Sequence, residues 1–259
     1  MKIQKIASIL VFAILFLSVA CQAGDRDFYQ LKIYSIENEQ QELRMDKFLK
    51  DAYIPALHRA GIDDVGVFKP IEDEKMKGKL IYVFIPFKSI DEFEKLNSVL
   101  HQDKRFKKIG DDYINAAHDD TPYQRIESII LRSFKSFPEH GSPKHNIPAS
   151  ERVYELRSYQ GATEKYYEKK VEMFNEGGES KLFVDLGFQP LFFCEVISGP
   201  VMPNLMYMIT FDNAESQKKH WETFVNSDEW NKLKSDPQYA NTVSHIDKIN
   251  LHPTEYSDL

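Results

Sequence analysis

The chain has 259 residues, of which 42% are hydrophobic, and its formal charge is −7 at pH 7. This length and composition exclude a disordered chain and allow a large core, in one large domain or in two of about 110 residues each. The acidic balance argues against a nucleic-acid partner and against adhesion to anionic lipid through basic residues.

The first twenty residues are predicted to be a secretory signal and not part of the fold. Lys2 and Lys5 precede an apolar run from Ile6 to Leu17, which ends in small residues. A run of about a dozen residues is shorter than the roughly twenty that a spanning helix needs, so a signal is favoured over a permanent anchor. Removing residues 1–20 takes away two lysines and changes the formal charge from −7 to −9. We therefore expect an exported protein of the periplasm or cell envelope.

Cys21 is a candidate for lipidation. It follows Ala20 at the end of the apolar run, as in the bacterial lipobox, where the signal is cut just before a lipidated cysteine. The alternative is ordinary cleavage after Ala20 or Ala23, without a lipid. A lipid on Cys21 would be the route by which the protein is tethered to a membrane. Cys194, the other cysteine, lies in an apolar run and is expected to be a buried thiol.

The rest of the chain resembles itself at an offset of about 125 residues, which indicates an internal repeat. Three segments of the first half fall on three of the second: Tyr29-Gln-Leu-Lys on Tyr154-Glu-Leu-Arg, Leu80-Ile-Tyr-Val-Phe on Leu205-Met-Tyr-Met-Ile, and Leu100-His-Gln-Asp on Val225-Asn-Ser-Asp. A stretch rich in proline and polar residues predicts a linker over 137–150. The predicted domains are therefore residues 24–136, a degenerate copy, and residues 151–259.

In the first half, alternating aromatic and β-branched residues predict the strands and an apolar helical period predicts the helices. The first helix is expected to end at Gly61. The expected order is strand 28–36, helix 42–60, strands 65–69 and 80–87, helix 91–100 and strand 123–134.

The second half is predicted to repeat this order. Its first helix begins near Thr163, a favourable N-cap, is interrupted at Gly177-Gly178, and ends at Gly187. The glycine pair predicts either a pocket mouth or a loop between two short helices. The other elements are strand 152–159, strands 189–198 and 205–211, helix 214–225 and strand 243–251.

The order β-α-β-β-α-β in each half is that of the ferredoxin-like unit. Two helices cover one face of such a sheet, and the other face needs a partner, which the second half can supply. The sequence thus predicts an α+β fold in which two tandem ferredoxin-like halves form a pseudo-dimeric α/β barrel.

Three segments of the second half resemble the NIPSNAP family. They are Val153-Tyr-Glu-Leu-Arg-Ser-Tyr, Asn204-Leu-Met-Tyr-Met-Ile-Thr-Phe and Leu251-His-Pro-Thr-Glu-Tyr-Ser, with Trp221, Phe224 and Trp230 between them. The resemblance covers residues 152–259 and extends to the first half only as a degenerate copy.

This resemblance implies a dimeric α/β-barrel fold. The family has animal mitochondrial members associated with quality control and many bacterial members without established activity, so it does not by itself fix a function. The wider superfamily includes haem-binding enzymes and cofactor-free monooxygenases. Related barrels also assemble through their helices and outer strands, which makes a homo-oligomer one option.

No phosphate-binding glycine loop, His-Glu-x-x-His, Cys-x-x-Cys or Gly-x-Ser-x-Gly motif is present, and we expect no dedicated cofactor or metal. Candidate ligand-binding residues must therefore be sought on faces of strands. Side chains two apart on a strand share a face. The candidates are Glu155, Arg157 and Tyr159 on one strand, His245 and Asp247 on another, and Glu195 on a third.

If these faces look into the space between the two sheets, they form a polar pocket. His245, oriented by Asp247 or Glu195, could then act as a base or as a metal ligand. The alternative is that the same residues sit at strand ends or make structural ion pairs.

His220 is the candidate for the haem alternative, provided that it points into the barrel. Trp221, Phe224 and Val225 beside it have the spacing of a helix face that packs on a sheet, which favours a structural role.

Three functions remain open. The first is a binding module of the cell envelope for an unknown small molecule or protein. The alternatives are a cofactor-independent oxygenase-like or isomerase-like enzyme and a haem-binding protein that uses the barrel interior.

Overall fold

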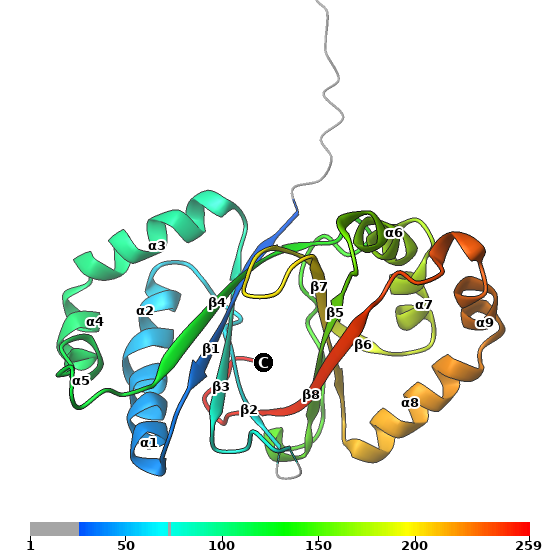
Figure 1. Ribbon diagram of the computed structural model, residues 1–259. Helices are drawn as coiled ribbons and strands as arrows, with labels where there is room; N and C mark the ends of the chain where they lie inside the picture. The colour runs from blue at the N-terminus through cyan, green and yellow to red at the C-terminus, as the bar shows by residue number, and fades with distance from the viewer. Residues whose placement is uncertain (1–25, 72–73) are drawn as a thin grey trace, which may run out of the picture.

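The computed structural model describes residues 26–71 and 74–259, so the predicted signal and the lipidation candidate Cys21 lie outside the described residues. The first half of the chain has the order β-α-β-β-α-β (Figure 1). Its elements are β1 (Phe28–Ser35), α1 (Glu39–Phe48), the π-helical turn η1 (Leu49–Tyr53), α2 (Ile54–Arg59), β2 (Gly66–Pro70), β3 (Leu80–Phe87), α3 (Ile90–Gln102), α4 (Lys104–Ile109), α5 (Asp111–Ile114) and β4 (Arg125–Ser133).

The second half has the same order, and the predicted strands and main helices are found within a few residues of their expected ends. Its elements are η2 (Ala149–Glu151), β5 (Val153–Gln160), α6 (Glu164–Asn175), α7 (Glu179–Asp185), β6 (Gln189–Ser198), β7 (Asn204–Phe211), α8 (Ala214–Asn226), α9 (Asp228–Lys234), η3 (Pro237–Tyr239) and β8 (His245–Pro253).

The eight strands form one closed barrel in the order β1-β3-β2-β8-β5-β7-β6-β4. Within each half the order is that of a ferredoxin-like sheet, β4-β1-β3-β2 and β8-β5-β7-β6, with antiparallel neighbours. The halves join through β2 with β8 and β4 with β6. Figure 1 shows the helices of the first half on one outer side of the barrel and those of the second half on the other. The predicted α+β fold with a single-chain pseudo-dimeric barrel is therefore confirmed.

Both faces of the strands are covered, which gives three apolar layers. The barrel interior holds an apolar cluster that includes large aromatic rings, namely Tyr29, Phe68, Phe84, Tyr154 and Phe192. The outer face of each half-sheet packs on its own helices, through Ile81, Val83 and Ile85 in the first half and through Leu205, Tyr207 and Ile209 in the second. A residue's place in a strand therefore decides whether it faces the interior or the helices.

The linker closes the aromatic end of the interior. The ring of His140 meets the edges of Tyr29 and Phe84, at centroid distances of 6.3 and 6.2 Å. Gly141 donates its N–H to the carbonyl of Leu191 at 2.8 Å. The C-terminal residue Leu259 packs against the same interior cluster.

Glycines end the predicted helices as expected. Gly61 and Gly187 each have a φ of +83°, the left-handed conformation that follows a helix C-terminus at little cost only for glycine. Thr163 caps α6 by accepting a hydrogen bond from the N–H of Tyr166.

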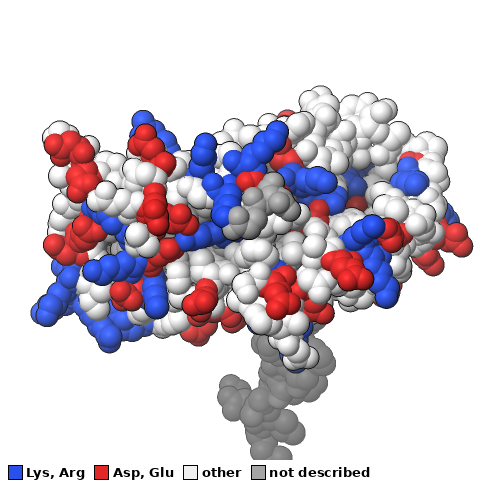
Figure 2. Space-filling view, turned by 90° about the horizontal axis from the view of Figure 1, so that it is seen from below, with Lys and Arg blue, Asp and Glu red and all other residues white. Residues whose placement is uncertain are grey.

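In the part of the chain that the structure describes, no helix is both long and apolar enough to cross a membrane. Lysine, arginine and acidic side chains are interspersed over the face that Figure 2 shows.

Candidate functional site

A cavity of about 470 Å³ lies on the helix-facing side of the second half-sheet, and we call it the Arg157 cavity. It lies between β5 and β8 on one side and α7, α8 and α9 on the other. Its lining combines aromatic rings with charged and amide side chains: Glu155, Arg157, Tyr159, Glu179, Phe183, Gln217, Lys218, Trp221, Phe224, Val225, Trp230, Lys248 and Asn250.

The carboxylate of Glu155 is the centre of the polar network. Its Oε1 lies 2.6 Å from both Nε and Nη2 of Arg157. Its Oε2 accepts hydrogen bonds from Nε1 of Trp221 at 2.6 Å and from Nε2 of Gln217 at 2.7 Å. Only 3% of Glu155 is exposed. A buried carboxylate is tolerated when it is paired and hydrogen-bonded in this way.

Arg157 is held on three sides. Besides Glu155, its Nη1 donates to the hydroxyl of Tyr159 at 3.2 Å, and its guanidinium carbon lies 3.8 Å from the centre of the Trp221 ring. Burial alone would lower the pKa of Arg157, but Tyr207, Tyr159 and Glu155 raise it above its ordinary value. The guanidinium therefore stays charged and fixed in one orientation at the cavity wall.

Behind Arg157, the hydroxyls of Tyr159 and Tyr207 are 2.8 Å apart. Burial raises the pKa of Tyr207 well above its ordinary value. Tyr207 therefore remains a neutral phenol, and the hydroxyl pair extends the network from the cavity into the core.

A second buried ion pair borders the same cavity. Nζ of Lys170 lies 2.7 Å from Oε2 of Glu179, and both residues are buried. Burial raises the pKa of Glu179, against the opposing effect of Lys170. The Lys170 ammonium also lies 4.9 Å from the ring centre of Phe174 and 5.7 Å from that of Trp230.

Three of the predicted site residues, Glu155, Arg157 and Tyr159, therefore meet in one cavity. The expectation that they face the space between the two sheets is wrong, because the interior positions of β5 belong to Tyr154, Leu156 and Ser158. The alternative expectation of an ion pair is met by Glu155 and Arg157.

His245 and Asp247 do not join this cavity. Nε2 of His245 lies 3.0 Å from Oδ1 of Asp247, as the sequence suggested, but both side chains are largely exposed, at 60% and 62%. Asp247 pairs with Ser158 in the strand register and lies on the interior side of the sheet, at one end of the barrel. A single pocket that combines His245 with Arg157 is therefore excluded by the alternation of the strands.

Glu195 lies in a third place. Its carboxylate is 2.7 Å from Nη1 of Arg26 and 3.3 Å from Nη2 of Arg132. It borders a separate groove with Glu168 and Glu172 from α6. The expectation that Glu195 orients His245 is wrong, because the two belong to different faces of the barrel.

The haem alternative required His220 to point into the barrel, and it does not. His220 lies on α8, outside the barrel, where Nδ1 is 2.8 Å from the carbonyl oxygen of Ser216. Its ring meets Phe188 and Phe211 at centroid distances of 5.1 and 5.8 Å. His220 is part of the packing between α8 and the outer face of the sheet.

Cys194 is fully buried among apolar residues, as expected, and burial raises the pKa of its thiol. Within residues 26–71 and 74–259, no group of three or more His, Cys, Asp or Glu side chains is arranged to hold a metal ion.

The sequence analysis does not single out several residues of the cavity and its network: Glu179, Phe183, Gln217, Lys218, Lys248 and Asn250 in the lining, and Lys170 and Tyr207 behind it. The glycine pair before Glu179 is the available signal, since a turn between two helices can direct the next side chain back toward the preceding helix. Trp221 was assigned to the packed face of α8, which is correct, but its indole N–H also bonds Glu155.

Solved structures with this fold cover most of the chain. One from Fusobacterium nucleatum, described as a "putative monooxygenase", has a TM-score of 0.59 at 9% identity and covers 88% of this chain and 92% of its own. A protein of the same description from Lactobacillus acidophilus has a TM-score of 0.59 at 11% identity, over 88% and 94%. An anthrone oxidase-like protein has a TM-score of 0.54 at 10% identity, over 90% and 93%. At these identities the likeness shows the fold alone.

The closed antiparallel barrel with helices on two sides is the fold of a dimeric α/β barrel, here with both halves in one chain. Residues 154–258 match the NIPSNAP family model, and this matched segment contains most of the Arg157 cavity network. No curated protein matches the chain.

Proposed function

We propose that the protein binds a small planar aromatic molecule with an acidic group in the Arg157 cavity. The observation that carries this proposal is the position of Arg157, fixed by Glu155 and stacked on Trp221 at the wall of a cavity that also holds Trp230. Flat aromatic walls favour a planar ligand, because rings gain contact area when they stack.

The charges of the lining favour an acid. Glu155 and Glu179 are each neutralised by a buried cation, Arg157 and Lys170. Lys248 then adds positive charge at the exposed edge of the cavity, together with Lys218, whose ammonium lies 3.9 Å from Glu222. A carboxylate or phenolate would be attracted there, and the buried ion pairs would not have to rearrange to receive it.

The chain offers a direct readout, because it has two tryptophans and both line this cavity. We expect 2-naphthoate to change the tryptophan fluorescence saturably and 2-naphthamide to bind more weakly. The double variant Lys218→Gln/Lys248→Gln should weaken 2-naphthoate binding by about three- to tenfold at low salt, the size expected for two exposed charges. Lys219→Gln is the matched control on α8, since Lys219 borders a different groove. Equal affinity for the acid and the amide, or no loss in the double variant, would count against the proposal.

A second candidate function is oxygenase-type chemistry on the bound molecule. Two structures with the same fold carry the description of monooxygenases and a third that of an anthrone oxidase-like protein. Arg157 and the Tyr159 hydroxyl lie together at the cavity wall, where they could stabilise negative charge that develops on a phenol or ketone oxygen. Anthrone is a suitable probe: oxygen uptake with formation of anthraquinone, reduced in Tyr159→Phe, would support this activity, and no uptake above the rate without protein would argue for binding alone.

We also propose that the protein is exported. Lys2, Lys5 and the apolar run that follows support this, and Cys21 supports lipid attachment. A mass spectrum of the protein from its native envelope should show a chain that begins at Cys21 with a diacylglyceryl group. A chain that begins after Ala20 or Ala23 without lipid would retain export and contradict lipidation, and an uncleaved chain would contradict both.

A further inference from the structure

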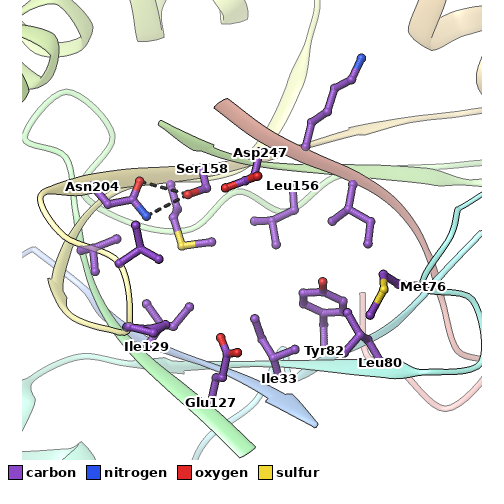
Figure 3. Close-up of a pocket in the computed structure, with 16 residues that line it drawn as sticks. Ile33, Met76, Leu80, Tyr82, Glu127, Ile129, Leu156, Ser158, Asn204 and Asp247 are labelled. Atoms are coloured by element: carbon purple, nitrogen blue, oxygen red, sulfur yellow. Dashed lines mark hydrogen bonds between the residues drawn. The ribbon is translucent and has the colours of Figure 1, made fainter. Parts of the chain in front are cut away.

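A second cavity, of about 290 Å³, lies inside one end of the barrel (Figure 3). We call it the barrel-end cavity. It lies between the two half-sheets and is separated from the Arg157 cavity by β5 and β8. Most of its walls are aliphatic or thioether side chains, from strands of both halves: Ile33, Leu80, Ile129, Leu156, Val196, Met206 and Ile249.

The sequence explains why space remains at this end. At the opposite end, interior positions carry Tyr29, Phe84 and Tyr154, and their rings fill the barrel. At this end the corresponding positions on β1 and β5 carry Ile33 and Ser158, which are smaller. An eight-stranded barrel is just wide enough to be filled by side chains or to hold one small ligand, so the exchange of rings for aliphatic groups opens a cavity.

Two carboxylates stand at the mouth of this cavity. Figure 3 shows Glu127 and Asp247 reaching toward it from opposite walls. The carboxylate of Asp247 already has two partners. Its Oδ2 accepts a hydrogen bond from Nε2 of Gln160 at 2.9 Å, and its Oδ1 lies 3.0 Å from Nε2 of His245. Among the described residues, the side-chain carboxylate of Glu127 makes no hydrogen bond and no ion pair, although its backbone pairs with β1.

Apart from the phenol hydroxyl of Tyr82, which also lines the cavity, the other polar groups of the lining do not compete for a ligand. Ser158 and Asn204 bond each other, with Nδ2 of Asn204 donating to Oγ of Ser158 at 2.8 Å. Lys248 pairs with Arg157 in the strand register, on the opposite face of β8 from Asp247. Its ammonium therefore belongs to the Arg157 cavity side and leaves the mouth acidic.

We propose that the barrel-end cavity binds a small apolar amine, with the hydrocarbon part between the half-sheets and the ammonium at Glu127 and Asp247. This site is independent of the proposed function of the Arg157 cavity. The apolar walls select the hydrocarbon, and the two carboxylates select a cation over a neutral or an anionic head group.

Methionine methyl NMR can test this site with an internal control. Met206 lines the barrel-end cavity, whereas Met45 and Met173 belong to the helix-side cores of the two halves. The probe is n-hexylamine, compared with 1-hexanol and hexanoate. We expect hexylamine to shift the Met206 resonance saturably and to leave those of Met45 and Met173 in place, with affinity in the order amine, alcohol, acid.

Two variants distinguish the contribution of the carboxylate charge to binding from that of the cavity volume. Glu127→Gln should weaken hexylamine binding by about three- to fivefold, as for an exposed ion pair, and leave 1-hexanol unchanged. Glu94→Gln, an exposed carboxylate on α3, is the matched control. Ile33→Phe should fill the cavity and abolish binding of both probes. Equal binding of amine and alcohol, tighter binding of hexanoate, unchanged binding in Glu127→Gln, or no Met206 shift would each overturn the proposal.

Discussion

The Arg157 cavity depends on one buried carboxylate with three side-chain donors. Arg157, Gln217 and Trp221 all bond Glu155, and they come from a strand and a helix that are far apart in the sequence. Each donor lowers the free-energy cost of burying the charge, so the loss of one should be felt in stability as well as in binding.

We expect Trp221→Phe to lower the free energy of unfolding by about 2–3 kcal/mol, because it removes a donor to a buried carboxylate as well as packing area. Trp230→Phe is the control, since that tryptophan has ring contacts but no side-chain hydrogen bond among the described residues. Urea unfolding should show the larger loss for Trp221→Phe. Equal losses would mean that the bond to Glu155 contributes little.

Lys32 is the counterpart of Arg157 on β1, and within the described residues no carboxylate pairs with it. Its Nζ lies 5.2 and 5.1 Å from the ring centres of Tyr34 and Tyr53. Burial lowers the pKa of Lys32 from 10.5 to about 8. The unfolded chain therefore binds more protons than the folded protein between about pH 8 and 10.5, so this lysine makes stability rise with pH across that window.

Lys32→Met should consequently be more stable than the wild type at pH 7, by up to about 3 kcal/mol, because the buried charge is gone. The difference should shrink by pH 10, where the wild-type amine is largely neutral in the folded state. Chemical unfolding of both proteins at pH 7 and pH 10 measures this. A difference that does not depend on pH would contradict the lowered pKa.

At the residue scale, the sequence grouped three of the six candidate side chains correctly but could not say which way they face. Alternation placed Glu155, Arg157 and Tyr159 together. Both faces of β5 are buried, however, by the barrel interior on one side and by helices on the other, so hydrophobicity could not tell the two faces apart. The burial of Glu179 could not be predicted either, since acidic residues are mostly exposed and its partner Lys170 lies on another helix.

At the scale of elements, the break between α6 and α7 shapes the site. The structure shows two short helices joined at Gly177-Gly178, where Gly178 has a φ of +82°. The turn directs Glu179, the first residue of α7, back toward Lys170 on α6. Capping residues and terminal glycines made the ends of these helices predictable, but the ion pair across the break depends on a tertiary contact.

Gly178→Ala should cost about 1–2 kcal/mol of stability, because an L-residue is strained in the left-handed region. A Cβ there would meet no atom within 4 Å, so the cost is one of backbone conformation and not of crowding. Gly178→Asn should cost less, since asparagine tolerates this conformation better. Thermal unfolding of the two variants distinguishes them, and equal losses would point to a cause other than backbone strain.

At the scale of the whole molecule, the barrel is closed by pairings between the halves. The β-α-β-β-α-β order predicted each half-sheet and their stacking. The sequence could not predict how the halves pair with each other. β2 pairs with β8, and β4 pairs with β6 with a register shift between Ile130 and Leu131. These strands are distant in the sequence, so no local sequence pattern specifies their register.

A fragment of residues 151–259 should not remain a stable monomer. Its interior sheet face carries Tyr154, Leu156, Met208 and Leu251, which the first half covers in the full chain. We expect the fragment to dimerise or aggregate, because association removes a large exposed apolar face from water. Light scattering after size exclusion measures this, and a folded monomer at micromolar concentration would contradict it.

The joining of two half-barrels in one polypeptide has a consequence for symmetry. A barrel made of two identical chains must carry every feature twice, related by a twofold axis. Here the two halves can differ: the positions of Glu155 and Arg157 in the second half are occupied by Gln30 and Lys32 in the first. The second half can therefore hold a charged cavity while the first keeps an aromatic, tightly packed core. Covalent linkage thus allows the two halves to have different binding properties, which two identical chains related by a twofold axis cannot have.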